Sequence, residues 1–149
     1  MHIVHVTDAA GRIVEPDWLM KAELVHRQLR PQIPEDYALA MHGVFADGGE
    51  MIVVVDKDNT RVLGGAGFRT YRNTFNGIHF YVDDLVTDSA LRSQGVGKLL
   101  IDHLSDIASA RGASKVTLDS GVQREQAHKF YFREQFVISC FNFTKKLES

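Results

Sequence analysis

The chain has 149 residues, of which 44% are hydrophobic, which suits the core of one globular domain rather than two. Its formal net charge of −2 provides no broad basic field, so we expect neither nucleic acid nor an anionic membrane surface as a partner. The only cysteine, Cys140, excludes an intramolecular disulfide and fits a reducing compartment. No apolar run approaches the roughly 20 residues of a membrane span. We therefore expect a single domain over residues 1–149 and a cytoplasmic location.

The first third of the chain predicts one strand followed by two helices. Residues 2–6 alternate polar and apolar side chains, as a half-buried strand does. Apolar residues at helical spacing then predict a helix over residues 15–29, with Pro16 in its first turn. Two prolines end this helix, and a second helical pattern covers residues 37–45 before a pair of glycines stops it.

The middle of the chain predicts three consecutive strands, over residues 51–55, 62–71 and 78–86. Polar turns separate them, which indicates antiparallel hairpins. Three glycines interrupt the second strand, namely Gly64, Gly65 and Gly67. Because glycine weakens a strand, they indicate either a bulge or the close approach of a ligand or another backbone.

A glycine-containing loop, residues 91–100, follows the third strand and opens into an amphipathic helix. The first N–H groups of a helix lack internal partners and lie at the positive end of its dipole, so they attract a phosphate. Gly95 and Gly97 remove side chains that would block its approach, and Lys98 adds positive charge. The alternative is that the glycines only serve the geometry of the loop.

Two other phosphate-binding motifs fit this loop poorly. A P-loop requires glycine where Arg92 stands, and serine or threonine where Leu99 stands. A dinucleotide fingerprint requires a third glycine in place of Leu100 and a strand that runs directly into the first glycine. Asp119 could imitate the ribose-binding acid of that fingerprint. The preceding strand, however, already ends near Val86, well before the first glycine. A dinucleotide-binding oxidoreductase fragment is therefore a weaker alternative.

The last third of the chain predicts a crossover followed by a helix and a long strand. The helix after the loop ends at Gly112, a C-cap, and residues 115–119 form a short strand, so a βαβ unit should make two strands parallel. Residues 124–134 predict a last helix, and residues 136–146 a closing strand. The expected fold class is therefore mixed α/β: a mostly antiparallel sheet with one parallel pair and about four helices.

Two motifs in this order resemble the GCN5-related N-acetyltransferase (GNAT) superfamily. One is the spacing Arg92-x-x-Gly95-x-Gly97 after an Asp-Leu-Val strand end, and the other is the run Ala-His-Lys-Phe-Tyr at residues 127–131. The resemblance covers most of the chain and is strongest over residues 82–143. Within the superfamily, the second motif and the closing Phe-x-Phe-Thr-Lys are most similar to aminoalkylphosphonate N-acetyltransferases.

The resemblance implies a single GNAT-like domain whose central parallel strands splay apart to hold acetyl-CoA. Backbone groups of Leu85, Val86 and Thr87 would then pair with the pantetheine arm of acetyl-CoA. The pyrophosphate would lie on the loop, whose implied cofactor contacts are Arg92, Ser93, Gln94, Gly95, Val96, Gly97 and Lys98. Two positions depart from the pattern: Arg124 stands where many members contact the cofactor through an asparagine, and Gln135 stands where the final turn usually has glycine.

Acetyl transfer to an amine needs a neutral nucleophile, a polarised thioester carbonyl and a proton for the leaving thiolate. The N–H of Val86 is the candidate donor to the carbonyl, and Tyr131 matches the family's tyrosine, which can act as general acid. The base candidates are Asp84, which we favour, and Asp83. Successive strand residues face opposite sides, so both carboxylates can reach one site only if a bulge intervenes. Their alternative role is capping the following turn, and that of Tyr131 is core packing.

Histidines contribute little to this interpretation. His26 and His42 fall within the first two helices and are expected to be ordinary surface or hydrogen-bonded core residues. His79 lies behind the two base candidates, together with Tyr81, and His128 is a candidate contact at the rim of the site. No short spacing of histidine, cysteine and carboxylate indicates a metal.

We therefore expect an acyltransferase that uses acetyl-CoA as co-substrate and acetylates a primary amine of a small molecule. Its acceptor determinants are expected on the first two helices and on residues 69–77. Two alternatives remain: a non-catalytic sensor that binds CoA or a nucleotide, and acetylation of a protein or peptide amine. The sequence leaves a homodimer open.

Overall fold

The computed structural model describes residues 1–148. It contains two compact units, Met1–Leu118 and a second that begins at Asp119, and each is described by itself. The first unit contains, in chain order, β1 (His2–His5), α1 (Pro16–Leu29), α2 (Tyr37–Ala46), β2 (Gly49–Val55), β3 (Val62–Asn73), β4 (Gly77–Thr87), a 3-10 turn (Ser89–Leu91), α3 (Val96–Ala110) and β5 (Val116–Leu118). These bounds agree closely with those predicted for this unit.

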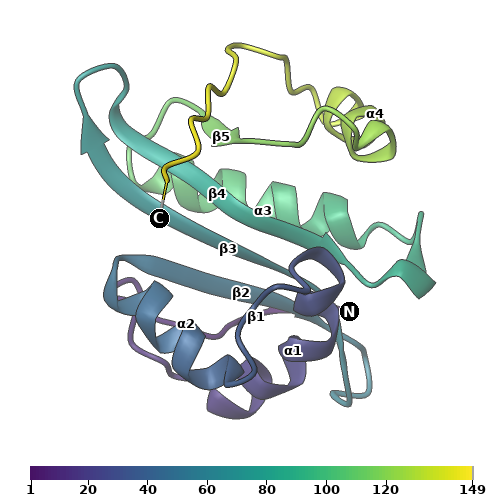
Figure 1. Cartoon of the computed structure of the whole chain (residues 1–149). Helices are drawn as coiled ribbons and strands as arrows, with labels where there is room; N and C mark the ends of the chain where they lie inside the picture. Colours follow the sequence, from purple (N-terminus) through teal and green to yellow (C-terminus); the bar gives the residue numbers. More distant parts are fainter. Residues whose placement is uncertain (149) are drawn as a thin grey trace. The chain divides into compact units, whose positions relative to one another are not determined.

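The first unit is built on one five-stranded sheet with the order β1-β2-β3-β4-β5. The first four strands are antiparallel, whereas β5 runs parallel to β4 after the α3 crossover. Helices α1 and α2 cover one face of this sheet, and α3 covers the other (Figure 1). The predicted mixed α/β class, with one parallel pair, is confirmed.

Each face of the sheet carries its own hydrophobic core. On the α1 and α2 face, buried side chains such as Leu19 and Met41 pack on β2. On the α3 face, Leu100 and Leu104 pack against strand residues that include Phe68 and Phe80. The rings of these two phenylalanines stack with centroids 5.2 Å apart. The apolar side chains of the helices thus pack on those of the strands in two layers, one on each face of the sheet. These layers determine which side chains of each strand face which helices.

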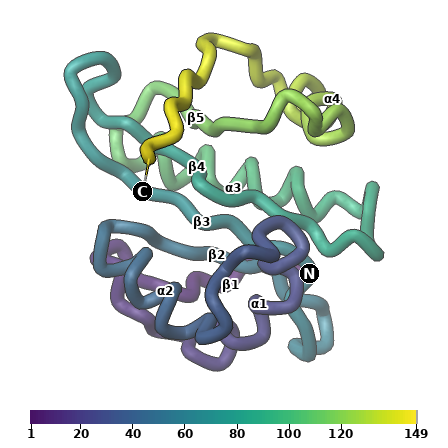
Figure 2. Tube along the Cα trace, viewed as in Figure 1, coloured from purple at the N-terminus to yellow at the C-terminus, as the bar shows by residue number. Residues whose placement is uncertain are grey.

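Strands β3 and β4 form a long hairpin (Figure 2). The pairing register shifts near its middle, which marks a bulge. Gly67 pairs with Asp84 and Phe68 pairs with Val82, so Asp83 is an extra residue in β4. The parallel ladder to β5 also stops at Val82, while β4 continues to Thr87. The two parallel strands therefore separate where the bulge lies.

The glycines of β3 mark both the bulge and a close approach. A Cβ atom on Gly64 would lie 2.7 Å from the carbonyl oxygen of Val86 and 2.7 Å from Cγ1 of Val96. Only glycine lets the start of α3 pack this closely on β3 and β4. Gly67 borders the bulge itself.

The second unit contains α4 (Glu125–Arg133), which confirms the last predicted helix. Gln135 follows this helix with φ 68°, the left-handed conformation that glycine usually supplies after a helix. The predicted strand over residues 136–146 is wrong, because residues 136–148 adopt no regular secondary structure. Apolar side chains such as Phe141 and Phe143 are exposed there, and no ladder pairs this stretch within the described residues. High β propensity alone does not make a strand without a partner.

Candidate functional site

The start of α3 is an open set of backbone donors. Gly95 is the N-cap residue with φ 82°, and no side chain caps this end of the helix. The N–H of Leu99 donates to the carbonyl oxygen of Gly95 at 3.0 Å, whereas those of Val96 and Gly97 have no acceptor within the described chain. Ser93 also has a positive φ, of 66°, so the loop turns sharply before the helix. This arrangement fits an anion such as a pyrophosphate.

The side chains around this turn are mostly directed to solvent. Arg92 and Gln94 are exposed. Lys98 is exposed and its Nζ lies 3.0 Å from Asp102 Oδ2, one helical turn further on. An exposed pair of this kind is weak, so an arriving anion can compete for the ammonium group.

The end of β4 offers backbone groups along one edge. Leu85, Val86 and Thr87 pair with β3 on one side. On the other side the described chain has no strand partner, because β5 pairs only up to Val82. An extended ligand can therefore add itself to this edge as a strand would.

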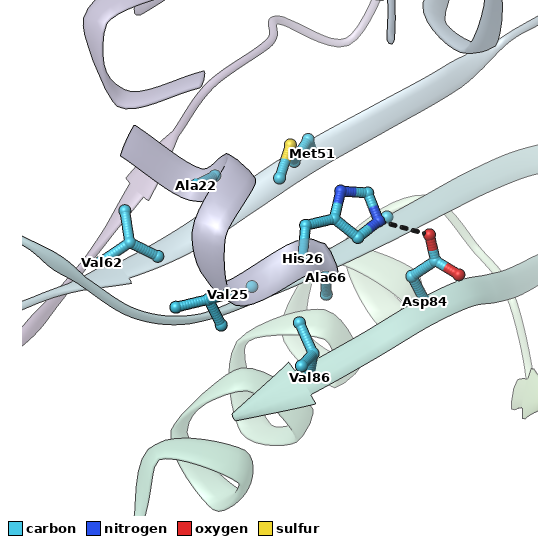
Figure 3. A pocket seen from close by; sticks show the side chains of 10 residues that line it. Ala22, Val25, His26, Met51, Val62, Ala66, Asp84 and Val86 are labelled. Atoms are coloured by element: carbon cyan, nitrogen blue, oxygen red, sulfur yellow. Dashed lines mark hydrogen bonds and ion pairs between the residues drawn. The ribbon is translucent and has the colours of Figure 1, made fainter. Parts of the chain in front are cut away.

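Asp84 is held by His26 of α1 and by Arg30, the C-cap residue of that helix. Figure 3 shows the contact with His26. His26 Nε2 donates to Asp84 Oδ2 over 2.7 Å, and Arg30 Nε donates to Oδ1 over 2.8 Å. Arg30 also donates through Nη2 to the carbonyl oxygen of Asp83, at 3.1 Å. The side chain of Asp84 keeps 20% of its surface exposed. We call His26 and Arg30 the α1 clamp, because together they hold the bulge by its side chain and its backbone.

The pKa of Asp84 reflects a balance between burial and these partners. Burial raises the pKa of the carboxyl, but hydrogen bonds and positive charge from His26 and Arg30 outweigh it and hold the pKa below its ordinary value. Asp84 is therefore an ionised acceptor at neutral pH. Its carboxylate has four lone-pair positions, and the α1 clamp uses two.

Tyr37 completes this chain of hydrogen bonds from α2. Its hydroxyl lies 2.9 Å from Nδ1 of His26, and both residues are buried. Burial, aided by the charges of Glu23 and Asp84, raises the pKa of the Tyr37 phenol, so Tyr37 stays protonated. Because an ionised Asp84 can only accept, Nε2 of His26 carries the proton of that hydrogen bond. Nδ1 faces the Tyr37 hydroxyl, which can donate or accept.

Asp83 faces an open hollow on the same side of the sheet. Its Oδ2 accepts from Arg69 Nε at 2.8 Å. The hollow has a volume of about 470 Å³, and its wall includes Tyr71, Tyr81 and, at the end of α2, Asp47. The bulge thus brings both aspartates to the α1 and α2 face, which is the condition under which both can serve one site.

A much smaller cavity lies behind Asp84. Its volume is about 10 Å³, room for about one water molecule, and its lining includes His26, Asp84 and Val86 (Figure 3). The polar atoms of this cavity belong to the network just described, while the remaining lining is largely apolar. The cavity thus lies between the network and Val86 of β4.

The other predicted site residues belong to the second unit. Tyr131 is buried on α4, with its ring 5.5 Å from that of Phe130 and 5.6 Å from that of Phe136. Arg124 is half-buried and forms the N-cap of α4. His128 donates from Nε2 to the carbonyl oxygen of Gly121 at 2.8 Å, which stabilises the turn before the helix.

Residues 1–148 contain neither a metal cluster nor a membrane-spanning helix. No group of three or more histidine, cysteine, aspartate or glutamate residues in this range is placed to hold a metal ion. No helix among the same residues combines the length and apolar character needed to cross a bilayer.

Comparison with known proteins identifies the family. The model of the Acetyltransferase (GNAT) family matches residues 16–135. The chain belongs to this family, in agreement with its open glycine turn and separated parallel strands.

Individual relatives share parts of the chain. An uncharacterized N-acetyltransferase of Bacillus subtilis, YhdJ, is 38% identical over 89 residues, which cover 59% of this chain and 63% of that protein. Aminoalkylphosphonate N-acetyltransferase of Salmonella typhimurium is 35% identical over 66 residues, 44% of this chain and 43% of that protein. The match therefore spans less than two thirds of either relative. The solved structure of AAC(6')-Iy with the bisubstrate analog CoA-S-monomethyl-acetylneamine has the same fold, with a TM-score of 0.80, 14% identity, and coverage of 99% of this chain and 98% of that one.

Sequence reasoning missed most of the network around Asp84. It expected His26 to be an ordinary surface or hydrogen-bonded core histidine, and it did not single out Arg30 or the Tyr37 hydroxyl. The available signal was position: His26 lies on the same helical face as Ala22 and Val25, both buried. A histidine on a buried face needs a polar partner, and Arg30 stands one turn after it.

Proposed function

We propose that this chain transfers the acetyl group of acetyl-CoA to a primary amine of a small molecule, in the cytoplasm. The observation that carries the proposal is the uncapped, glycine-bearing start of α3 beside a β4 edge that has lost its parallel partner. These two features suit the two parts of CoA: backbone N–H donors for its pyrophosphate and a strand edge for its amide-bearing arm. The family membership supports the same reading.

The loop and strand divide the binding of acetyl-CoA between them. Residues 92–98, with the N–H groups of the first turn of α3, would hold the pyrophosphate, and Arg124 is a further candidate contact. Leu85, Val86 and Thr87 would pair with the pantetheine arm. The sequence points to the N–H of Val86 as the donor to the thioester carbonyl, but the N–H of Asp88 donates to the carbonyl oxygen of Leu63 in β3. In this regular ladder the N–H of Val86, two residues earlier, points the same way. We therefore assign the donor that stabilises the developing negative charge on the thioester oxygen to the N–H of Leu85, on the open edge.

The chemistry then needs a base and an acid. An alkylammonium, with a pKa near 10, must lose a proton before or during attack. Asp84 is ionised and partly exposed, so it can bind the ammonium group and accept that proton as the N–C bond forms. When the C–S bond breaks, the electron pair leaves on sulfur, and Tyr131 is the proposed donor of the proton that converts the thiolate to the thiol.

The hollow beside Asp83 is the proposed acceptor pocket. It lies on the sheet face that also presents Asp84, and its 470 Å³ suit a small molecule rather than a folded protein surface. The Salmonella relative is named for acting on aminoalkylphosphonates, which are small primary amines. This supports a small-molecule acceptor, with aminoalkylphosphonates among the first candidates.

An acceptor screen tests the proposal. Purified protein, acetyl-CoA and a panel of primary amines are incubated, and the released CoA is measured as free thiol, with a no-amine reaction as the control. The panel includes an aminoalkylphosphonate, a diamine, an aminoglycoside and a peptide with a free N-terminus. We expect thiol release with at least one small amine and its acetylated product by mass spectrometry. Binding of acetyl-CoA without turnover of any amine would favour a sensor instead.

A further inference from the structure

The α1 clamp, Tyr37 and Asp84 form a largely buried network of polar side chains. It joins three elements of the first unit, because His26 and its neighbour Arg30 come from α1 and the C-cap of α1, Tyr37 from α2 and Asp84 from β4. Burying a histidine and a carboxylate has a desolvation cost that apolar side chains of similar size would avoid. A network retained at this cost suggests a role beyond packing.

Its location suggests what that role is. The network holds β4 at Asp83 and Asp84, the residues of the bulge, where the ladder to β5 has just ended. Arg30 binds there to the carbonyl oxygen of Asp83 as well as to Asp84 Oδ1. The contacts therefore restrain a segment that sheet hydrogen bonds hold on one side only.

We propose that His26 is a positioning residue of the acetyl transfer, which with Arg30 fixes the Asp84 carboxylate in the orientation that receives the acceptor amine. This inference rests on the proposed function and adds to it a residue that never touches the substrate. His26 acts through its Nε2–H, at 2.7 Å from Asp84 Oδ2. Tyr37 fixes the other ring nitrogen and so restricts rotation of the imidazole.

The hydrogen-bond geometry explains why both contacts are needed. Arg30 alone holds only Oδ1 of Asp84, which leaves the carboxylate able to rotate about its bond to Cβ. With His26 on Oδ2, both oxygens are engaged and the plane of the carboxylate is fixed. One lone pair on each oxygen remains for an ammonium group, and the exposed 20% of the side chain gives access to it.

The charged surroundings of Asp84 come from few sources. His26 of α1 and the C-cap residue Arg30 face it. The charges of Glu23 and Arg27, also on α1, act on the pKa of the neighbouring Tyr37. On the sheet, Asp83 is paired with Arg69. Loss of the His26 contact should therefore raise the pKa of Asp84, because burial remains while one donor is gone.

Two matched variants separate the contacts of His26. In His26→Gln the amide nitrogen takes roughly the place of Nε2 and can still donate to Asp84. In His26→Asn it takes roughly the place of Nδ1, so the contact to Tyr37 survives and that to Asp84 is lost. Both replacements are polar and uncharged, so a role limited to stability predicts similar behaviour. His2→Gln, at an exposed position of β1, is the control for handling of the protein.

The experiment measures kcat and KM with the acceptor found in the screen, and the titration of Asp84 by carboxyl carbon NMR. We expect His26→Asn to lower kcat about tenfold and to raise the pKa of Asp84 by about one unit or more, whereas His26→Gln stays within about threefold of the parent. Stabilisation by acetyl-CoA should be equal in all three proteins. Equal kcat and equal Asp84 titration in the two variants would overturn the inference.

The two readouts also separate this inference from the proposed function. If the parent acetylates no amine, the proposed function fails, but the titration of Asp84 still tests the clamp. If the parent is active and His26→Asn keeps its kcat and its Asp84 titration, only the positioning role fails. If His26→Asn does not fold, His26→Gln carries the test, because a loss of kcat in a folded His26→Gln with the parental Asp84 titration contradicts the mechanism proposed for the clamp.

Discussion

Arg111 and Glu50 form a two-pronged ion pair that joins the end of α3 to the edge of the α3-side core. Nη1 lies 2.6 Å from Glu50 Oε2, and Nη2 lies 2.8 Å from Oε1. The Glu50 side chain is only 7% exposed, and Arg111 also donates to Thr70 at 2.8 Å. The hydrogen bond to Glu50 raises the pKa of the Arg111 guanidinium, so Arg111 stays charged.

Replacing one partner of this ion pair should lower the free energy of unfolding more than replacing both. Arg111→Met leaves the buried carboxyl group of Glu50 without its partner. We therefore expect the free energy of unfolding to fall by about 3–5 kcal/mol. The double variant Glu50→Met with Arg111→Met should recover most of that loss, because no buried charge is left. Urea unfolding of the parent and the two variants measures both values. A double variant as unstable as Arg111→Met would show that the pair stabilises by attraction rather than by mutual neutralisation.

Two glycines predict opposite effects of the same substitution. Gly64→Ala places a methyl group 2.7 Å from the Val86 carbonyl oxygen and from Val96 Cγ1, so we expect a loss of about 1–3 kcal/mol from overpacking. Gly43 lies in α2, and a methyl group added there would meet no atom within 4 Å, so Gly43→Ala should stabilise by about 0.5–1 kcal/mol. Thermal and urea unfolding of both variants check the signs. A neutral Gly64→Ala would mean that α3 shifts easily on the sheet.

Gly97 tests the proposed pyrophosphate site. At about 100 times its dissociation constant, acetyl-CoA should add about 2.7 kcal/mol of stability, a rise of several degrees in Tm, whereas NAD should add nothing. Gly97→Asp should abolish this rise through bulk and negative charge, without harm to the helix, since an acidic residue suits its first turn. Ser105→Asp, on an exposed position of α3, controls for the added charge. A rise with NAD and none with acetyl-CoA would contradict the proposal.

Tyr131 tests the proposed general acid. Tyr131→Phe removes the hydroxyl and leaves the ring beside Phe130 and Phe136, so the Tm and the binding of acetyl-CoA should change little. Loss of a general acid lowers the rate by about 10²–10⁴-fold, and we expect the lower end because a thiolate leaves readily. The measurement is kcat together with the acetyl-CoA dissociation constant. A kcat within about threefold of the parent would make Tyr131 a packing residue.

Asp84 gives the stability of the fold a predictable pH dependence. The folded pKa of this carboxyl lies below its ordinary value near 4, so its stabilising effect is present above that value and is lost as the pH falls through the folded pKa. The parent should therefore exceed Asp84→Asn in stability by about 1–3 kcal/mol near pH 6, a margin that narrows below about pH 4. Urea unfolding from pH 7 down to about pH 2 measures the margin. A margin that does not change with pH would exclude an ionised Asp84 as its source.

The spacing of apolar residues, together with the prolines and glycines that end helices and strands, predicted nearly all of the first unit. Prolines, glycines and apolar spacing are local signals, and they located α1, α2 and the β3–β4 hairpin to within a few residues. The glycines of β3 also indicated the bulge, although not which residue of β4 it would displace. Arg30 contacts both Asp83 and Asp84 at the bulge, and these contacts join positions more than fifty apart in the chain, beyond the reach of local signals.

Local signals do not report contacts between distant parts of the chain, which explains both the wrong strand and the missed network. A strand needs a partner, and the apolar alternation after Phe136 says nothing about whether one is available. The site residues on the glycine turn were predicted by local geometry, and their binding role stays a prediction. The Asp84 network combines α1, α2 and β4, so it emerges only when the helices pack on the sheet.

The bulge at Asp83 also makes the length of this hairpin more critical than its composition. Side chains in a strand alternate, so removal of one residue there would restore a regular ladder and turn every β4 side chain on one side of the cut to the opposite face. Buried Phe80 and Val82 would then face the helices α1 and α2, or Asp84 would turn toward the α3 core. Single substitutions across this stretch can be accommodated one at a time, whereas a one-residue deletion would rearrange both cores together. Related chains that diverge widely in sequence should therefore keep the spacing between the β3–β4 turn and the glycine loop.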